Sequence, residues 1–275
     1  MPKDRAKNQN KINTNSKHIA LRAKDLGIGY VVKKQPKCIV DNINFELVKG
    51  ELAAIVGING IGKSTLLRTL GAVQPSLSGK VKIGNEALES YSNTALATIL
   101  SVVLTEPVAS KNLRVRELIA LGRQPYTNWL GTMNNTDNDK VDKAIRMVGL
   151  EQIQFKKCYE LSDGQVQKVM IARALAQDTD LMLLDEPTTH LDLFHKVHIL
   201  KLLQRISHET GKTILYTTHE IELAIQLCDK MLILDGKGNS FGSPSELVEQ
   251  KSFETLFPKD TIIFDAVTSS FRLKN

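Results

Sequence analysis

The amino-acid sequence predicts an α/β fold built on a mostly parallel sheet. Short apolar runs, of which Leu181–Leu184 is the clearest, alternate with stretches of helical length through the second half of the chain. Strands that are apolar on both faces are typical of parallel sheets, which are covered by helices on both sides. The chain has 275 residues, enough for one large domain or two small ones. Hydrophobic residues make up 42% and charged residues 24%, which excludes the disordered, collagenous and coiled-coil classes.

The individual elements follow from local patterns of apolar and turn-forming residues. We expect strands at Ile19–Leu21, Ile43–Leu47, Glu51–Ile58, Val81–Ile83, Ser101–Leu104, Leu181–Leu184, Thr213–Thr217 and Lys230–Leu234. We expect helices from Lys63 onward and at Val115–Leu121, Lys140–Val148, Gly164–Ala176, Asp192–Ser207 and Ile221–Cys228. Polar residues predict a loop at Met133–Asp139, and the closing segment Asp260–Asn275 suggests a short strand pair. Apolar residues at helical spacing after Asp192 predict a core-facing stripe: Leu193, Val197, Leu200, Leu203 and Ile206.

The charge balance and the ends of the chain narrow the class of protein. The net charge of +6 and the pI near 9.1 allow nucleic acid, an anionic membrane surface or an anionic ligand as partner. Residues 1–17 carry +4 of this charge and no apolar core, which predicts a disordered basic tail and not a secretory signal. No run approaches the ~18 apolar residues of a membrane span, so we expect a cytoplasmic protein. Cys38, Cys158 and Cys228 lack zinc-site or disulfide spacing, and we expect them to be buried.

The strongest functional signal is a phosphate-binding loop between an apolar strand and a helix. The segment Gly57-Ile58-Asn59-Gly60-Ile61-Gly62-Lys63-Ser64 matches G-x-x-x-x-G-K-[ST], and Thr65 follows it. The glycines let backbone N–H groups converge on phosphate oxygens, and the helix N-terminus adds positive potential. In such loops the lysine reaches the β- and γ-phosphates and the hydroxyl binds Mg²⁺, which assigns these roles to Lys63 and Ser64.

A second signal is a pair of carboxylates directly after the strand Leu181–Leu184. Asp185 is then expected at the carboxyl edge of the sheet, where ligands of open α/β folds bind, and can hold Mg²⁺ directly or through water. Glu186 is placed to orient an attacking water or to accept its proton. Together with the phosphate loop, these carboxylates predict hydrolysis of a nucleoside triphosphate.

A third motif points to one family of phosphate-loop enzymes. The segment Leu161-Ser162-Asp163-Gly164-Gln165 precedes the carboxylates and resembles the LSGGQ signature of the ATP-binding cassette (ABC) ATPases. The resemblance covers about residues 18–255. It implies an α/β phosphate-loop NTPase fold with a mostly parallel core sheet, an antiparallel β subdomain and an inserted helical subdomain at about 105–161. Residues 256–275 would then form a C-terminal extension.

The family resemblance also implies roles for residues outside the first two motifs. His219 matches the switch histidine that contacts the γ-phosphate, and Asp192 lies in the loop that communicates across a dimer of cassettes. Tyr30 matches the aromatic residue on which adenine stacks. In the family two copies pair head to tail, so that the ATP held by one copy meets the signature residues of the other: Ser162, Gly164 and Gln165.

Two positions depart from the family pattern. Asp163 replaces the second signature glycine; a carboxylate suits the helix dipole but not a phosphate, so we expect it to point away from the nucleotide. Thr105 stands where the family has a glutamine that reaches Mg²⁺ and the attacking water. We expect Thr105 to act through a water, or Glu106 to substitute in part.

A single cassette without a membrane span resembles the importer type, whose permease subunits are separate chains. The stretch Gly122-Arg123-Gln124-Pro125-Tyr126 is similar to the GRxPY stretch of cassettes that serve iron–siderophore, haem and cobalamin uptake. The resemblance implies an ATPase at the cytoplasmic face of the membrane, bound to a permease, served by an external substrate-binding protein and independent of nucleic acid. One alternative is a soluble ABC ATPase acting on the ribosome or nucleic acid. Another is a degenerate cassette that serves as a nucleotide-sensing scaffold.

Overall fold

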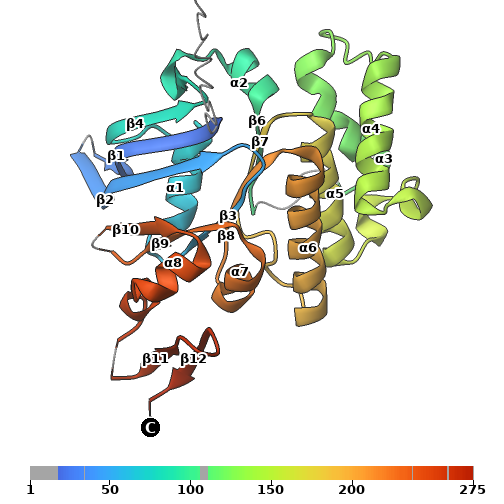
Figure 1. Ribbon diagram of the computed structural model, residues 1–275. Coiled ribbons are helices and arrows are strands. Elements are labelled where there is room, and N and C mark those ends of the chain that lie inside the picture. The colour runs from blue at the N-terminus through green and yellow to red at the C-terminus, as the bar shows by residue number, and fades with distance from the viewer. Residues whose placement is uncertain (1–17, 34, 106–110, 237, 259, 275) are drawn as a thin grey trace, which may run out of the picture.

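The computed structural model describes residues 18–33, 35–105, 111–236, 238–258 and 260–274 (Figure 1). The predictions for the basic tail at 1–17 and for Glu106 lie outside these residues. Three sheets are present in the described part: one of six strands, one of four and one of two. Among the described residues no helix is both long and apolar enough to span a membrane.

The six-stranded sheet forms the centre of the fold. Its strand order is β10 (Asn239–Gly242), β9 (Lys230–Leu234), β3 (Leu52–Val56), β8 (Thr213–Thr217), β7 (Leu181–Leu184) and β6 (Leu100–Val103). The strands from β9 to β6 are parallel and β10 is antiparallel, which confirms the predicted mostly parallel sheet. All residues of β3, β7 and β8 are buried, as expected for strands covered on both faces.

Alternate residues of the central strands serve two different cores. Along β3, Ala53 and Ile55 pack in one core with α1 (Lys63–Leu70) and the four-stranded sheet. Leu52, Ala54 and Val56 face the other core, with α5 (Asp163–Ala176) and α6 (Leu193–Thr210). The period of two along a strand therefore places helices on both sides of the sheet.

The four-stranded sheet is antiparallel, with the order β2 (Gln35–Val48), β1 (Ile19–Val32), β4 (Ser78–Ile83) and β5 (Glu86–Ala87). The strands predicted at Ile19–Leu21 and Ile43–Leu47 were too short. In the structure β1 and β2 have 14 residues each. The register shifts between Ala23 and Leu26, where Asp25 adopts φ 49°. Such bulges interrupt the alternation of apolar and polar residues on which a strand prediction depends.

The helices between β6 and β7 stand together beside the central sheet (Figure 1). They are α3 (Val115–Ala120), η2 (Leu121–Tyr126), α4 (Asn135–Val148), η3 (Glu151–Ile153), η4 (Cys158–Glu160) and α5, and α2 (Asn93–Ile99) precedes β6. The predicted loop at Met133–Asp139 was partly wrong. Asn134 and Asp137 form a reciprocal capping box that starts α4, so the polar residues begin a helix and do not interrupt one.

The remaining elements follow β8 and β9 or lie early in the chain. They are α7 (Ile221–Leu227), α8 (Pro244–Glu249), η1 (Leu88–Ser90), η5 (Ser252–Thr255), β11 (Ile262–Asp265) and β12 (Ser270–Leu273). The antiparallel pair β11–β12 confirms the strand pair expected at the end of the chain.

Two burial predictions were wrong. Leu193 is 67% exposed and does not join the predicted stripe of α6, because the buried residues of that helix begin at Ile199. Cys38 is exposed on β2, whereas Cys158 and Cys228 are buried as expected. Neither position could be placed from the local sequence, since both lie near the margin of an element.

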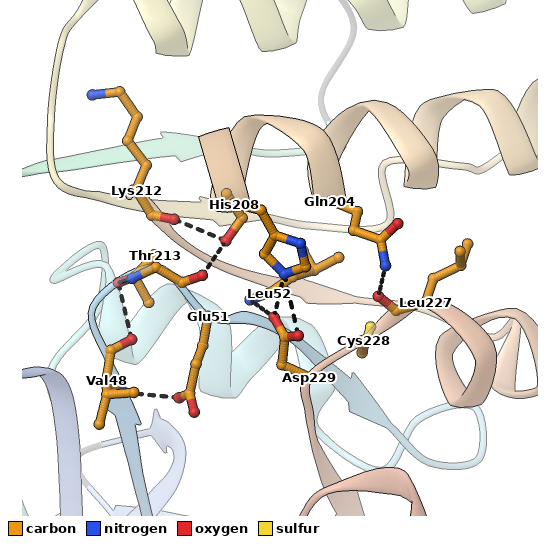
Figure 2. A network of polar contacts seen from close by, with 12 residues as sticks. Val48, Glu51, Leu52, Gln204, His208, Lys212, Thr213, Leu227, Cys228 and Asp229 are labelled. Carbon is orange, nitrogen blue, oxygen red and sulfur yellow. Dashed lines mark hydrogen bonds and ion pairs between the residues drawn. The ribbon is translucent and has the colours of Figure 1, made fainter. Parts of the chain in front are cut away.

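A polar network fixes the amino end of β3, the strand that leads into the phosphate-binding loop (Figure 2). Asp229 accepts a hydrogen bond from the Leu52 N–H at 2.8 Å and contacts His208 Nε2 of α6 at 2.9 Å. Glu51 accepts from the Val48 N–H at 2.8 Å and so holds the turn before β3. These contacts tie β3 to α6 and to β9. The strand that leads into the phosphate-binding loop therefore has a fixed position.

Candidate active site

The predicted functional residues gather at the carboxyl ends of three neighbouring strands. The order β3, β8, β7 in the sheet places the loop 57–62 next to His219 and the Asp185–Glu186 pair. Parallel strands that lie side by side end at the same edge, so residues far apart in sequence meet there.

The phosphate-binding loop needs glycine for two distinct reasons. A Cβ on Gly57 would lie 2.6 Å from the Leu234 carbonyl oxygen, so no side chain fits between the loop and β9. Gly62 adopts φ 109° at the N-cap of α1, a conformation that glycine allows without strain. In the described structure no side chain caps α1 and its first turn has no acidic residue. The free N–H groups of this helix end therefore suit an anion.

Lys63 is a buried cation held by its own loop. Its side chain is 4% exposed, and Nζ donates to the carbonyl oxygens of Gly57 at 3.0 Å and Ile58 at 3.3 Å. Burial lowers the pKa of the Lys63 ammonium, while the charges of Glu186 and Asp185 oppose that effect. The ammonium is thus positioned at the loop before any phosphate binds.

Asp185 is the centre of a hydroxyl–carboxylate cluster. Ser64 Oγ donates to Asp185 Oδ1 at 2.9 Å, and Thr217 Oγ1 donates to the same oxygen at 2.7 Å. Thr105 Oγ1 donates to the backbone carbonyl of Asp185 at 3.2 Å, so Thr105 contacts the main chain of Asp185 and not its carboxylate. The end of β6 is thereby joined to the end of β7.

Glu186 and His219 form a second interacting pair in the site. His219 Nε2 lies 2.6 Å from Glu186 Oε1, and His219 Nδ1 lies 3.3 Å from Lys63 Nζ. Glu186 adopts φ 47°, a left-handed conformation that costs a non-glycine residue roughly 1–2 kcal/mol. The backbone is held there because the Glu186 N–H donates to Thr217 Oγ1 at 2.8 Å. Strain that the surroundings maintain in this way is typical of functional sites.

Tyr30 reaches the other side of the phosphate loop. Its hydroxyl lies 2.6 Å from Thr65 Oγ1 in α1, and its side chain is 50% exposed. The exposed ring therefore lies beside the helix that follows the loop, and Asn59 and Gly60 lie in the loop itself.

The signature residues form a separate group. Ser162 Oγ accepts from the Gln165 N–H at 3.4 Å, and Gln165 Oε1 accepts from the Ser162 N–H at 3.1 Å. The two residues thus form a capping box at the start of α5. Gly164 is buried, and a Cβ there would lie 3.2 Å from the His195 ring. Asp192 caps α6, and the hydrogen bond from the His195 backbone lowers its pKa. Among the described residues no hydrogen bond or ion pair joins this group to Lys63, Asp185, Glu186 or His219.

Comparison with known proteins places these motifs in one family. The family model described as ABC transporter matches residues 40–189. The chain belongs to the ABC transporter family. The achromobactin transport ATP-binding protein CbrD of Dickeya dadantii is 36% identical to this cassette over 242 residues, which are 88% of each chain. Cassettes of the family are ATPases, and this cassette is an ATPase.

Two solved structures share the fold of the cassette. One is an inward-facing conformation of a putative metal-chelate type ABC transporter, with a TM-score of 0.75 and 28% identity over 87% of this chain and 89% of that chain. The other is a dimeric post-hydrolysis state of an ATP-binding cassette bound to ADP and Pi, with a TM-score of 0.68 and 26% identity over 82% of this chain and 98% of that chain. The α/β cassette fold predicted from the motifs is therefore confirmed.

The donor set of the cassette fits Mg²⁺. Ser64 Oγ and the Asp185 carboxylate are oxygen ligands 2.9 Å apart, and Mg²⁺ prefers oxygen ligands. Within the described residues no group of three or more His, Cys, Asp or Glu side chains could hold a metal ion. Mg²⁺ typically takes only one or two protein ligands and completes its shell with phosphate and water.

Sequence reasoning missed two hydroxyls of the cassette. Thr217 contacts both Asp185 and Glu186, and Thr189 Oγ1 donates to Glu186 Oε2 at 3.0 Å. A signal was present, since Thr217 is the last residue of a strand that ends at the same edge as Asp185. Threonine is also common inside strands, so only the neighbouring position of β8 and β7 gives it a role.

Proposed function

We propose that this cassette is the ATP-hydrolysing subunit of an importer that takes up a metal chelate through a separate membrane permease. The observation that carries the proposal is the group formed by Lys63, Glu186 and His219 beside the Ser64–Asp185 pair. A cation, a candidate base and a hydroxyl–carboxylate pair converge there on one helix N-terminus, which suits hydrolysis of a triphosphate.

Each residue of this group has a proposed part in hydrolysis. The N–H groups of the loop Gly57–Gly62, including Asn59 and Gly60, and the Lys63 ammonium bind the phosphates, while adenine stacks on the Tyr30 ring. Glu186 orients the attacking water and accepts its proton as the water attacks the γ-phosphorus and ADP leaves. His219 contacts the γ-phosphate and holds the Glu186 carboxylate in place.

Mg²⁺ would be held by Ser64 and Asp185, with Thr105 acting through a water. When bound, it supplies positive charge to the β- and γ-phosphate oxygens. Thr217 keeps the Asp185 carboxylate oriented through its hydrogen bond. Thr65 follows Ser64 in α1 and faces Tyr30, which links the adenine side of the site to the phosphate side.

The active unit is proposed to be a head-to-tail dimer of two copies. The signature group caps its own helix, and we propose that in the dimer the signature group of one copy completes the phosphate site of the other. Ser162, Gly164, Gln165 and Asp192 of one copy would then face the ATP of the other. The dimeric solved structure of the same fold supports this arrangement.

The cargo assignment rests on the relatives and not on the stretch 122–126. Arg123 is buried, pairs with Asp137 at 3.0 Å, donates to the Ala176 carbonyl at 2.8 Å and lies 3.9 Å from the Tyr126 ring centroid. These contacts hold η2 against α4 and α5, so Arg123 has a structural role and does not indicate the cargo. The solved metal-chelate type transporter of the same fold supports a metal chelate as cargo. Within that class we propose an iron–siderophore, haem or cobalamin complex.

The proposed location is the cytoplasmic face of the membrane, with the helical subdomain at about 105–161 receiving the permease and residues 18–255 forming the ATPase domain. An external substrate-binding protein would act indirectly through that permease. Most of the net charge lies in residues 1–17, so the ATPase domain itself offers little attraction for nucleic acid. The ribosome-associated alternative is therefore not favoured.

Isolation of the membrane complex tests this proposal. The tagged chain, extracted in detergent, is expected to co-purify with a polytopic membrane protein, and its ATPase activity is expected to rise when a metal chelate and its binding protein are added. Co-sedimentation with ribosomes in place of a membrane protein would contradict the importer role. An assembled complex that binds ATP without hydrolysing it would support the scaffold alternative.

A further inference from the structure

The C-terminal hairpin lies beyond the segment that matches the family model, and the motifs leave it without a role. It consists of β11 and β12, in which Phe264 pairs with Phe271 across the strands. In Figure 1 the hairpin lies below α7 and α8, at the end of the chain. Its contacts connect it to the active site.

Aromatic packing anchors the hairpin to the body of the cassette. The Phe264 ring stacks on the fully buried Phe253 ring of η5, with centroids 4.8 Å apart. The Phe271 ring lies 5.0 Å from Phe257 and 5.1 Å from Phe264, edge to face in both pairs. Aromatic pairs of this geometry are attractive and bury much apolar area. They therefore fix the position of β12 relative to η5.

One hydrogen bond then joins the hairpin to α7. The Phe271 N–H donates to Glu222 Oε1 at 2.9 Å, and Glu222 lies in the first turn of that helix. On its other side, the start of α7 is tied to α6 through Lys196 and Glu220, 2.5 Å apart. A groove of about 460 Å³ separates α7 from the hairpin, and His219, Glu222, Phe257 and Phe271 all line it.

The start of α7 depends on these contacts because the helix is weak by itself. It has 7 residues, and among the described side chains none caps its N-terminus. A helix of this length is unstable in isolation and takes its position from tertiary contacts. His219 lies two residues before the helix, and the Ile221 N–H donates to the His219 carbonyl at 3.0 Å. The backbone of His219 is thus tied directly to the start of α7.

We propose that Glu222 is a positioning residue of the ATPase site, through which the C-terminal hairpin holds His219 against Glu186. This inference rests on the proposed function, since it assigns His219 a part in hydrolysis. The hairpin acts on the site through the backbone that leads into α7 and contacts neither nucleotide nor Glu186.

The test compares Glu222→Ala, which removes the acceptor, with Glu222→Gln, which keeps Oε1. With the purified full-length chain and ATP alone as the probe, Glu222→Ala is expected to lower kcat about three- to tenfold, with KM and nucleotide affinity within about twofold of wild type. Glu222→Gln is expected to stay within about twofold of wild type throughout. Glu222 is exposed, so its truncation leaves no buried cavity, and Glu249→Ala in α8 is the matched control for loss of an exposed helical carboxylate.

A double variant separates positioning from general stability. If Glu222 acts through His219, adding Glu222→Ala to His219→Ala causes no further loss of kcat, whereas an additive loss overturns the proposal. A lower thermal midpoint that accounts for the loss also overturns it. If the wild-type chain hydrolyses ATP and Glu222→Ala has the same kcat, the positioning role of Glu222 is overturned, but the proposed function is not. A wild-type chain that binds ATP and does not hydrolyse it overturns the proposed function as well.

Discussion

The cassette presents two helix N-termini that are proposed to bind phosphate, and their surroundings differ. The end of α1 lacks a side-chain cap, follows Gly62 in a left-handed conformation and lies beside Lys63, Asp185 and His219. The end of α5 is capped by Ser162 and Gln165, and Asp163 lies in its first turn. Among the described side chains none caps the α1 end, whereas at the α5 end Ser162 Oγ accepts from the Gln165 N–H and Gln165 Oε1 accepts from the Ser162 N–H.

This difference shows what one chain can complete by itself. The α1 end draws on β3, β7 and β8, whose carboxyl ends are adjacent in one sheet. The α5 end lies on a helix beside the sheet, and its polar contacts among the described residues are local to 162–165. Residues around α1 should therefore affect events within one copy, and residues around α5 should affect only the meeting of two copies.

Glu186→Gln should have the largest effect at the α1 end. The amide cannot accept the proton of the attacking water, so ATP hydrolysis is expected to fall at least about a hundredfold while ATP binding is retained. Closed dimers should then accumulate with ATP, as measured by size-exclusion chromatography with light scattering. Glu209→Gln, on an exposed turn of α6, is the control, and wild-type turnover by Glu186→Gln would remove Glu186 from catalysis.

Lys63→Ala tests nucleotide binding by the α1 end alone. Loss of the charge-assisted hydrogen bonds to phosphate is expected to weaken nucleotide affinity about ten- to a hundredfold in the isolated chain. Calorimetric titration with ATP measures this, with exposed Lys143→Ala as the control for loss of a positive charge. Unchanged affinity would mean that the loop holds phosphate without its lysine.

Ser162→Ala probes the α5 end, where the effect should appear only between copies. ATP affinity of the isolated chain is expected to remain unchanged, while ATP-dependent dimerisation and hydrolysis fall about tenfold. The lost cap also costs stability of about 1 kcal/mol. Ser243→Ala removes the equivalent capping serine of α8 and should cost similar stability without affecting dimerisation. Equal losses of dimerisation in both variants would reduce the role of Ser162 to capping.

Thr105→Ala should have the smallest effect, because among the described residues its hydroxyl contacts the Asp185 backbone carbonyl and not a side chain. Loss of one neutral hydrogen bond and of its water contact is expected to reduce coupled ATP hydrolysis about two- to fivefold, with nucleotide affinity retained. Thr105→Ser keeps the hydroxyl and should restore activity in the reconstituted complex. Coupled hydrolysis that is the same in all three proteins would show that Thr105 has no part in the site.

The elements that were predicted well are those whose own residues show a clear local pattern. The strands Leu181–Leu184 and Thr213–Thr217 were placed at their observed bounds because a fully buried strand reads as an apolar run bounded by turns. The extent of β1 and β2 was underestimated because bulges break their alternation. Exposure of Leu193 was missed because periodicity marks the apolar face of a helix without saying where the core ends.

The candidate site divides in the same way. Lys63, Ser64, Asp185 and Glu186 belong to contiguous motifs whose chemistry requires those residue types, so the sequence identified them without coordinates. Thr217 and Glu222 belong to no motif, and each acquires its contact from a strand or hairpin distant in the chain, whereas Thr189 contacts Glu186 three residues before it. Their residue types are common, so sequence patterns cannot distinguish them from surface or strand residues.

By itself the sequence therefore determined the fold class, the phosphate loop and the carboxylates that follow the buried strand, since these depend on local periodicity and on short motifs. Only the tertiary structure decided which side chains meet. The strand order placed Thr217 between Asp185 and Glu186, and the packing of four phenylalanines brought the C-terminal hairpin against α7. The physical reason is that such contacts depend on the pairing of distant segments, and the energy of that pairing is spread over a whole core and not carried by any single motif.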